Sequence, residues 1–392
     1  MYNYREIDKY ELRILVFSAF ILLVSIFVNG GLLTHPDSEE YTKTLEIFAE
    51  GSDKSGLDKE VVLFRPLIFI LALPFYYITG DSMISIGLLN SLFYIFSGPI
   101  FYRYVNFHTQ NEVLSFWSSI YFLGSFPVLY WGLSILMEMG TWFLLLLCLY
   151  RLRKISVENI DKNDYITMLI VGFSILYKPT LVVIPIFIFI SLLFKFGIKQ
   201  FPIKYFCLIG LILSVPIIIN QIYVLHFFEA DYYNDFLKRS LFFWEKDSTP
   251  IVPAEYSFKY TQTYRLLTFF VAFPMIIPFF IIGILDLKHG NKKLYNYSLL
   301  YIFSSLIIIL GFSSTLNYIG AGSPRYAFIL FPVFIPITII GIESFFEKTS
   351  TYYEKFHLDK KNLSKYLICF YLALSFFISI FGQEVRQFLG FW

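Results

Sequence analysis

The sequence predicts an all-α, polytopic bundle of transmembrane helices. Of its 392 residues, 57% are hydrophobic and only 15% are charged, whereas soluble domains carry about 25% charged residues. A water-soluble globule of this length has too little interior to hide so much apolar surface. The apolar residues also fall into runs of about 17–25 residues, the length that crosses a bilayer as a helix. Composition therefore excludes a soluble enzyme, a disordered chain and a small disulfide-stabilised module.

The charge balance and the cysteines narrow the class further. The chain has 31 Lys and Arg against 29 Asp and Glu, which does not favour a nucleic-acid partner. Cys148, Cys207 and Cys369 each lie within an apolar run, at no metal-ligand spacing. We interpret them as small core hydrophobes. Membrane lipids are the expected surroundings.

The apolar runs predict about eleven spans. The first, residues 12–33, follows basic residues but lacks a small-x-small cleavage site, which favours an uncleaved first helix. The other ten are expected at 83–105, 113–131, 139–152, 164–177, 179–195, 205–225, 266–287, 294–316, 327–346 and 366–382. One further run, residues 63–79, is short and contains Pro66 and Pro74.

The distribution of Lys and Arg decides whether residues 63–79 cross the membrane. If they do not cross, 19 basic residues lie inside and 12 outside; if they cross, 11 lie inside and 20 outside. Cytoplasmic segments carry the excess of Lys and Arg. We therefore predict a multi-pass protein of the cell membrane with a cytoplasmic N-terminus. Residues 63–79 then form an interfacial or re-entrant helix on the outer face.

This topology predicts one integral membrane domain over residues 1–392. Two outer segments are long: the first outer loop, residues 34–82, and the second outer segment, residues 226–264. We expect no soluble C-terminal domain after the last span.

The first outer loop is expected to contain an amphipathic helix. Tyr41, Leu45 and Phe48 fall on one helical stripe, so this helix is predicted to lie flat with its apolar face on the membrane. Asp37 precedes it, and Glu40 three residues later completes a capping box. Asp37 is therefore explained as a helix cap without any catalytic role. Its carboxylate is also held at the bilayer surface, where it could take part in a reaction. Both interpretations stay open from spacing alone.

The same loop resembles the first outer loop of the GT-C glycosyltransferases. Pro36, Asp37 and Tyr41 form a Pro-Asp-x-x-x-Tyr element just after the first span, and Ala49 and Gly51 end the short helix. These polytopic enzymes use polyprenyl-phosphate sugars. They include the protein O-mannosyltransferases and the aminoarabinose transferase of lipid A.

Four more matches follow in order, all on the predicted outer side. Residues 64–67 (FRPL) are similar to the family's Arg-Pro-Pro-Leu element. Residues 131–140, with Glu138, resemble the second outer loop. Lys178 and the proline after it resemble a conserved turn between two helices, and Arg325 followed by tyrosine resembles the opening of a late helix. The resemblance covers about residues 12–340.

Two departures from the family pattern concern its acidic residues. The family often has a second acid directly after the first Asp, where this chain has Ser38. Its second acidic residue usually precedes proline, whereas Glu138 precedes Met139.

The resemblance implies transfer of a sugar from a polyprenyl-phosphate donor to an acceptor hydroxyl at the outer face, with inversion. Asp37 is then the general base, and Glu138 positions the acceptor or helps to hold a divalent cation. Lys178 and Arg325, with Arg65 as a third cation, stabilise the donor phosphate. The acceptor is a glycan, a lipid or a protein.

The charged residues alone point to the same side of the membrane. Ionisable groups near hydrocarbon are costly and indicate function by default, although Lys and Arg at an interface can reach water by snorkelling. The residues predicted at the outer ends of spans are Arg65, Asp81, Glu138, Lys178 and Arg325.

A metal is one open question. No cofactor is certain, but His35, Asp37 and Glu138 could together bind a divalent cation. A His-x-Asp pair in a loop is more often simply solvated.

The second outer segment supplies possible sugar contacts. Tyr232, Tyr233 and Trp244 are available to stack on sugar rings, as is Tyr41 in the first loop. Aromatic residues also gather at membrane interfaces without any ligand. The sequence shows no Asp-x-Asp in this segment and no Gly-rich loop on the inner face, so a nucleotide-sugar donor or ATP has no visible binding element.

Two alternatives remain. A membrane transporter or lipid flippase would suit the number of spans, but we find no repeated halves in the sequence. An oligosaccharide polymerase of the O-antigen type would also transfer sugars at the outer face, but its donor and its acceptor would both be different.

Overall fold

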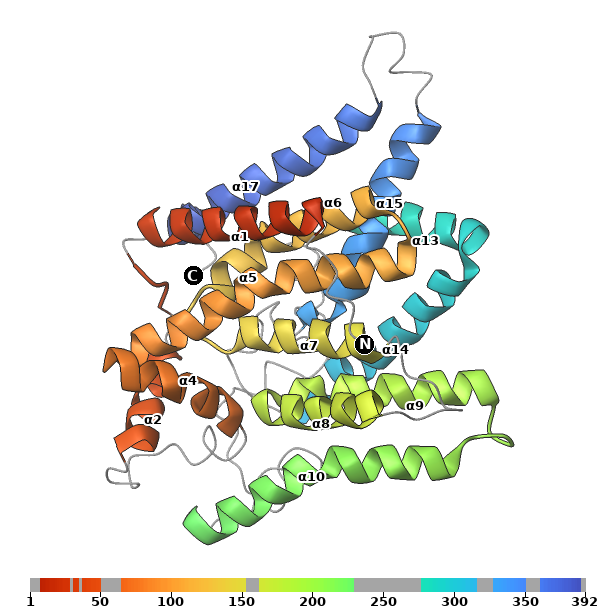
Figure 1. The fold of residues 1–392 in the computed structure, drawn as a ribbon. Helices are drawn as coiled ribbons and strands as arrows, with labels where there is room; N and C mark the ends of the chain where they lie inside the picture. The colour runs from red at the N-terminus through yellow and green to blue at the C-terminus, as the bar shows by residue number, and fades with distance from the viewer. Residues whose placement is uncertain are drawn as a thin grey trace.

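A computed structural model of the chain shows a bundle of helices (Figure 1). The structure describes residues 8–28, 31–34, 37–50, 65–152, 162–228, 276–315, 327–349 and 360–388. Every named element in these ranges is a helix, and extended pairing among them is limited to one isolated parallel bridge between Leu33 and Ser134. The all-α prediction is therefore confirmed for the described residues.

The described residues contain the following helices, in chain order. They are α1 (Lys9–Val28), α2 (Ser38–Glu50), α4 (Pro66–Thr79), α5 (Ser82–Thr109), α6 (Glu112–Leu123), η2 (Val128–Gly132), α7 (Glu138–Leu152), α8 (Lys162–Tyr177), η3 (Pro179–Val182), α9 (Val183–Phe196), α10 (Ile203–Phe228), α13 (Ile276–Gly290), α14 (Lys292–Thr315), η6 (Ala327–Leu330), α15 (Phe331–Lys348) and α17 (Lys360–Phe388).

Six of the described helices are long and apolar enough to cross a membrane. They are α1, α5, η3 with α9, α10, η6 with α15, and α17. Of the other predicted spans, 139–152, 164–177 and 294–316 coincide with α7, α8 and α14, and the described part of 266–287 lies in α13; these helices are shorter or less apolar. The prediction of membrane-spanning helices is thus supported at this coarser level.

The span predicted at residues 113–131 is wrong as a single helix. Helix α6 ends at Leu123, and a separate π-helical turn occupies Val128–Gly132. Gly124 closes the last turn of α6, and Pro127 has no N–H to continue an α-helical ladder. The chain then runs without regular structure to the start of α7. The result is a broken helix followed by an irregular loop inside the bundle.

Helices α2 and α4 lie together at one end of the bundle, on the left in Figure 1, beside the start of α5. Helix α4 has 14 residues, or about 21 Å of length, which is shorter than the roughly 30 Å hydrocarbon core. Gly80, in the left-handed conformation with φ of 67°, ends α4. Asp81 then caps α5 by accepting a hydrogen bond from the Ile84 amide at 2.8 Å.

The apolar stripe of α2 faces protein and not lipid, contrary to the sequence-based expectation. Tyr41 and Leu45 are buried, and the Tyr41 ring lies 6.5 Å from that of Phe69 in α4. Because α4 folds back beside α2, it covers the stripe that the sequence pattern assigned to the membrane. On the exposed edge, Tyr76 donates a hydrogen bond to Glu50, which raises the pKa of Tyr76 to about 12.

At the opposite end of the bundle, side-chain hydrogen bonds hold α1 and the preceding Asp8 against α5. The Arg103 guanidinium donates two hydrogen bonds to the Glu11 carboxylate, at 2.6 and 2.7 Å. One residue earlier in α5, the Tyr102 hydroxyl donates to Asp8 at 2.6 Å. These contacts fix the pairing of the first helix with α5.

Candidate functional site

A buried ion pair lies near the end of the bundle that carries α2 and α4. The Lys178 ammonium is 2.7 Å from Glu138 Oε1, and the two side chains are only 7% and 3% exposed. Glu138 is the first residue of α7, and Lys178 is the residue between α8 and η3. The sequence predicted both as site residues, and the structure brings them into direct contact.

The local sequence explains where Lys178 lies. The residue before a proline is driven out of the helical region, and Lys178 before Pro179 is extended, with φ of −151° and ψ of 125°. Helix α8 therefore ends at Tyr177, and Pro179 opens the next short helix. The turn directs the lysine side chain toward the start of α7.

Three hydrogen-bonding groups hold the loop that precedes Glu138. The Ile135 amide donates to the Leu33 carbonyl at 2.9 Å, and the Ser38 hydroxyl donates to the Ile135 carbonyl at 2.9 Å. From α5, the Asn90 amide donates to the Ser134 and Leu136 carbonyls, at 2.9 and 2.7 Å. Irregular backbone at membrane depth needs such partners, because hydrocarbon offers none.

These contacts also bring Asp37 into the neighbourhood of Glu138. Asp37 directly precedes α2, as the capping interpretation requires, and its neighbour Ser38 touches the loop three residues before Glu138. Two acidic residues that are a hundred positions apart in the chain are therefore carried by segments in contact.

Tyr177 adds a buried hydroxyl to this region. Its side chain is fully buried, and a Cβ placed on Gly140 would meet the hydroxyl oxygen at 2.1 Å. This close approach explains the glycine at position 140. Among the described residues the Tyr177 hydroxyl has no hydrogen-bond partner, which is a costly arrangement for a buried polar group.

Arg65 and Tyr41 are brought together in the first outer loop. The Arg65 guanidinium donates to the Tyr41 hydroxyl at 2.9 Å, from its position just before α4. Tyr41 is only 4% exposed. In this structure the tyrosine therefore serves the packing of α2 on α4, and its predicted sugar contact stays a prediction.

Several predicted site residues cannot be placed, because they lie outside the described residues. They are His35, Tyr232, Tyr233, Trp244 and Arg325. Among the residues that are described, no three His, Cys, Asp or Glu side chains gather as a metal site would require. The suggested cation site with His35 stays a prediction.

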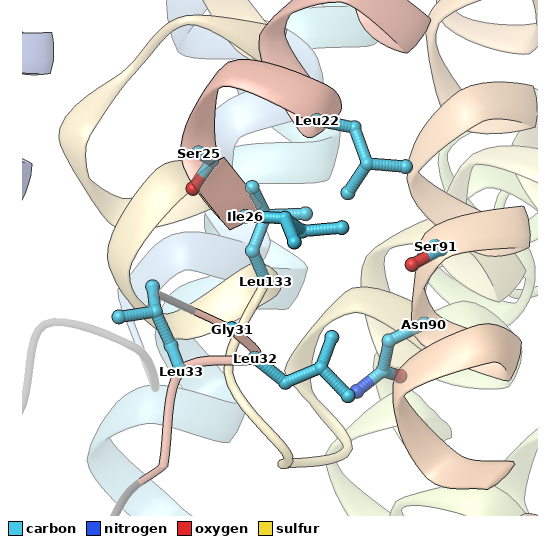
Figure 2. A pocket seen from close by; sticks show the side chains of 9 residues that line it. All are labelled: Leu22, Ser25, Ile26, Gly31, Leu32, Leu33, Asn90, Ser91 and Leu133. Carbon is cyan, nitrogen blue, oxygen red and sulfur yellow. The ribbon is translucent and has the colours of Figure 1, made fainter. Parts of the chain in front are cut away.

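Asn90 is the residue that the sequence reasoning missed. It is buried at 1% exposure and, with Ser91, Leu133 and Gly31, lines a small cavity between α1, α5 and the loop (Figure 2). A polar residue within the apolar run 83–105 was the available signal.

The fold and the site define a helical membrane protein with a buried, loop-supported ion pair near one end of its bundle. No protein-family model, curated protein or solved structure matches the chain.

Proposed function

We propose that the chain is a GT-C-type glycosyltransferase that moves a sugar from a polyprenyl-phosphate donor to an acceptor hydroxyl at the outer face of the membrane. One observation carries the proposal. The segments of Asp37 and Glu138 are in contact, and Glu138 is paired with Lys178. The three residues belong to separate sequence motifs.

The proposed topology has eleven spans, a cytoplasmic N-terminus and the site on the outer side. Helix α4 is too short to cross and lies beside the start of α5 (Figure 1), which supports its assignment to the outer face. Labelling a cysteine introduced at Asp81 tests this assignment. Access from outside is expected, and strict access from inside would reverse the faces of the whole bundle.

The proposed chemistry is a single displacement. Asp37 removes the proton from the acceptor hydroxyl, and the oxygen attacks the anomeric carbon as its bond to the phosphate oxygen breaks. The leaving polyprenyl phosphate takes the electron pair of that bond, and the anomeric configuration inverts. Lys178, with Arg325 and Arg65, stabilises the negative charge on the phosphate.

The ion pair adds one requirement to this scheme. Since Lys178 is buried and contacts Glu138, a donor phosphate that reaches the lysine must share it with the carboxylate or displace it. Glu138 then holds the ammonium in place until the donor arrives. A displaced Glu138 carboxylate is free to orient the acceptor or to bind a divalent cation.

A transporter or flippase is the second candidate, and one observation favours it. The break between α6 and α7 places an irregular loop and a buried ion pair within the bundle, and broken helices with buried charge occur at transporter binding sites. A transporter would move its substrate intact, whereas a transferase cleaves the bond between sugar and phosphate.

The deciding experiment uses the purified protein in vesicles with polyprenyl-phosphate sugars and detects released polyprenyl phosphate. Asparagine is as good an N-cap residue as aspartate, so Asp37→Asn removes the base with little effect on α2, and a loss of about 10²–10⁴-fold in turnover is expected. Asp81→Asn is the matched control, because it makes the same replacement directly before another helix at this end of the bundle, where Asp81 caps α5. Normal turnover by Asp37→Asn overturns the base assignment. Movement of donor across the vesicle without bond cleavage would favour the transporter.

A further inference from the structure

One face of α5 supports both loops of the candidate site. Gly87 and Asn90 are three residues apart, so they lie on the same face of the helix. A Cβ on Gly87 would meet Leu32 Cδ1 at 2.3 Å, which shows how closely the segment before α2 approaches α5. One turn further on, Asn90 bonds the loop before α7.

Asn90 makes two contacts that few side chains of its size can make. Both bonds run from its single amide nitrogen to carbonyls two residues apart, Ser134 and Leu136. An amide group carries two donor hydrogens on that nitrogen, whereas a hydroxyl carries one. Asn90 therefore fixes the loop at two points, and Leu136 lies only two residues before Glu138.

Asn90 is also far from either end of α5. Asn90 lies eight residues beyond Ser82, which is about 12 Å along α5. A polar residue at this depth is expensive unless its hydrogen bonds are made. Asn90 makes both donor bonds, while its Oδ1 has no partner among the described residues. Its place is explained by the loop that it holds.

We infer that Asn90 is a positioning residue that sets Glu138 against Lys178. Its two bonds fix the loop to α5. The bond from the Ile135 amide to the Leu33 carbonyl then fixes the segment that leads to Asp37 relative to the same loop. The consequence for catalysis rests on the proposed function, whereas the geometric consequence for the ion pair does not.

If Asn90 had only a local structural role, its mutation would have a different effect on the Glu138–Lys178 pair. If Asn90 only satisfies two carbonyls, its loss lowers stability but leaves the Glu138–Lys178 interaction unchanged. If Asn90 positions Glu138, its loss weakens that interaction, and the effects of mutating Asn90 and Lys178 are no longer additive.

The test is a double-mutant cycle on the full-length protein, read as the apparent melting temperature in one detergent. Asn90→Leu keeps the volume and removes both donors. We expect the combined Asn90→Leu and Lys178→Met variant to lose clearly less than the sum of the two single losses. Ser91→Ala is the control, because the Ser91 hydroxyl bonds within α5 to Gly87 at 2.7 Å; with Lys178→Met it should be additive.

Additive losses for Asn90→Leu and Lys178→Met would overturn the inference. Should Asn90→Leu fail to fold, Asn90→Asp gives the same test, since a carboxyl group keeps the shape of the amide but offers at most one donor.

The activity measurement separates this inference from the proposed function. With a polyprenyl-phosphate sugar as substrate, Asn90→Leu is expected to lower kcat by roughly a hundredfold, as a displaced catalytic group does, with little change in the donor KM. A non-additive cycle with no sugar release by the wild-type protein would reject the function and keep the positioning role. A lowered kcat with an additive cycle would reject the positioning role alone.

Discussion

Two ion pairs lie near opposite ends of the bundle, and they are built differently. The Glu11–Arg103 pair joins the start of α1 to the far end of α5 through two hydrogen bonds, and the arginine side chain is 44% exposed. The Glu138–Lys178 pair joins α7 to the turn before η3 through the Lys178 ammonium and Glu138 Oε1, and neither side chain is more than 7% exposed.

The difference in geometry and exposure indicates that the two ion pairs have different roles. A forked, partly exposed pair keeps much of its solvation and fixes geometry, which suits a clamp between two helices. A deeply buried pair loses the hydration of both charges, and apolar residues of the same volume often give equal or better stability. Stability alone therefore does not account for Glu138 and Lys178, whereas the role proposed for them at a reaction site would require both charges.

Lys178→Met is expected to have the largest effect on stability. This change leaves the Glu138 carboxylate buried without its ammonium partner, and we expect a loss of about 3–5 kcal/mol in the free energy of unfolding. Thermal unfolding in detergent measures it. The double variant with Glu138→Gln should recover most of the loss, because the buried charge is then gone. A single variant as stable as the wild type would show that the pair is not buried as described.

Arg103→Ala is expected to have a smaller effect. The Arg103 side chain is 44% exposed and that of Glu11 is 9% exposed. Removal of the arginine side chain therefore opens a path for water to the Glu11 carboxylate, and we expect a loss of about 1–2 kcal/mol. High salt should reduce the difference between this variant and the wild type, since exposed charge pairs are screened. A loss equal to that of Lys178→Met would remove the distinction between the two ends.

Tyr41→Phe is expected to have the smallest effect of the three. The change removes the hydrogen bond that the Arg65 guanidinium donates but keeps the ring against Phe69. We expect a loss of about 1 kcal/mol and little change in donor affinity, measured by unfolding and by turnover against donor concentration. A large loss of turnover without loss of stability would instead place Tyr41 in contact with the substrate.

Much of the fold could be predicted from the sequence, because hydropathy and helix length are local properties. Ten of the eleven apolar runs coincide with helices in their described parts, as does the short helix at residues 66–79. The break after α6 could not be placed this way, since a hydropathy window passes smoothly over Gly124 and Pro127. The burial of the α2 stripe also depends on α4 folding back, which is a tertiary event.

The site could be predicted only as separate residues. Motif resemblance selected Glu138 and Lys178, but no local pattern indicates that they form a pair across 40 residues. Asn90 was missed because its role depends on a loop some 45 residues away in the chain, seen only in its hydrogen bonds to Ser134 and Leu136.

Donor turnover by Lys178→Ala and by Arg103→Ala, compared side by side, tests whether the Glu138–Lys178 pair belongs to the reaction site. Both variants remove one cation from an ion pair, and the release of polyprenyl phosphate is measured per folded molecule with a polyprenyl-phosphate sugar as donor. We expect Arg103→Ala to retain wild-type turnover and Lys178→Ala to lose about a hundredfold, as removal of a group that stabilises transition-state charge does. Equal turnover by the two variants would contradict the assignment of the Glu138–Lys178 pair to the reaction site.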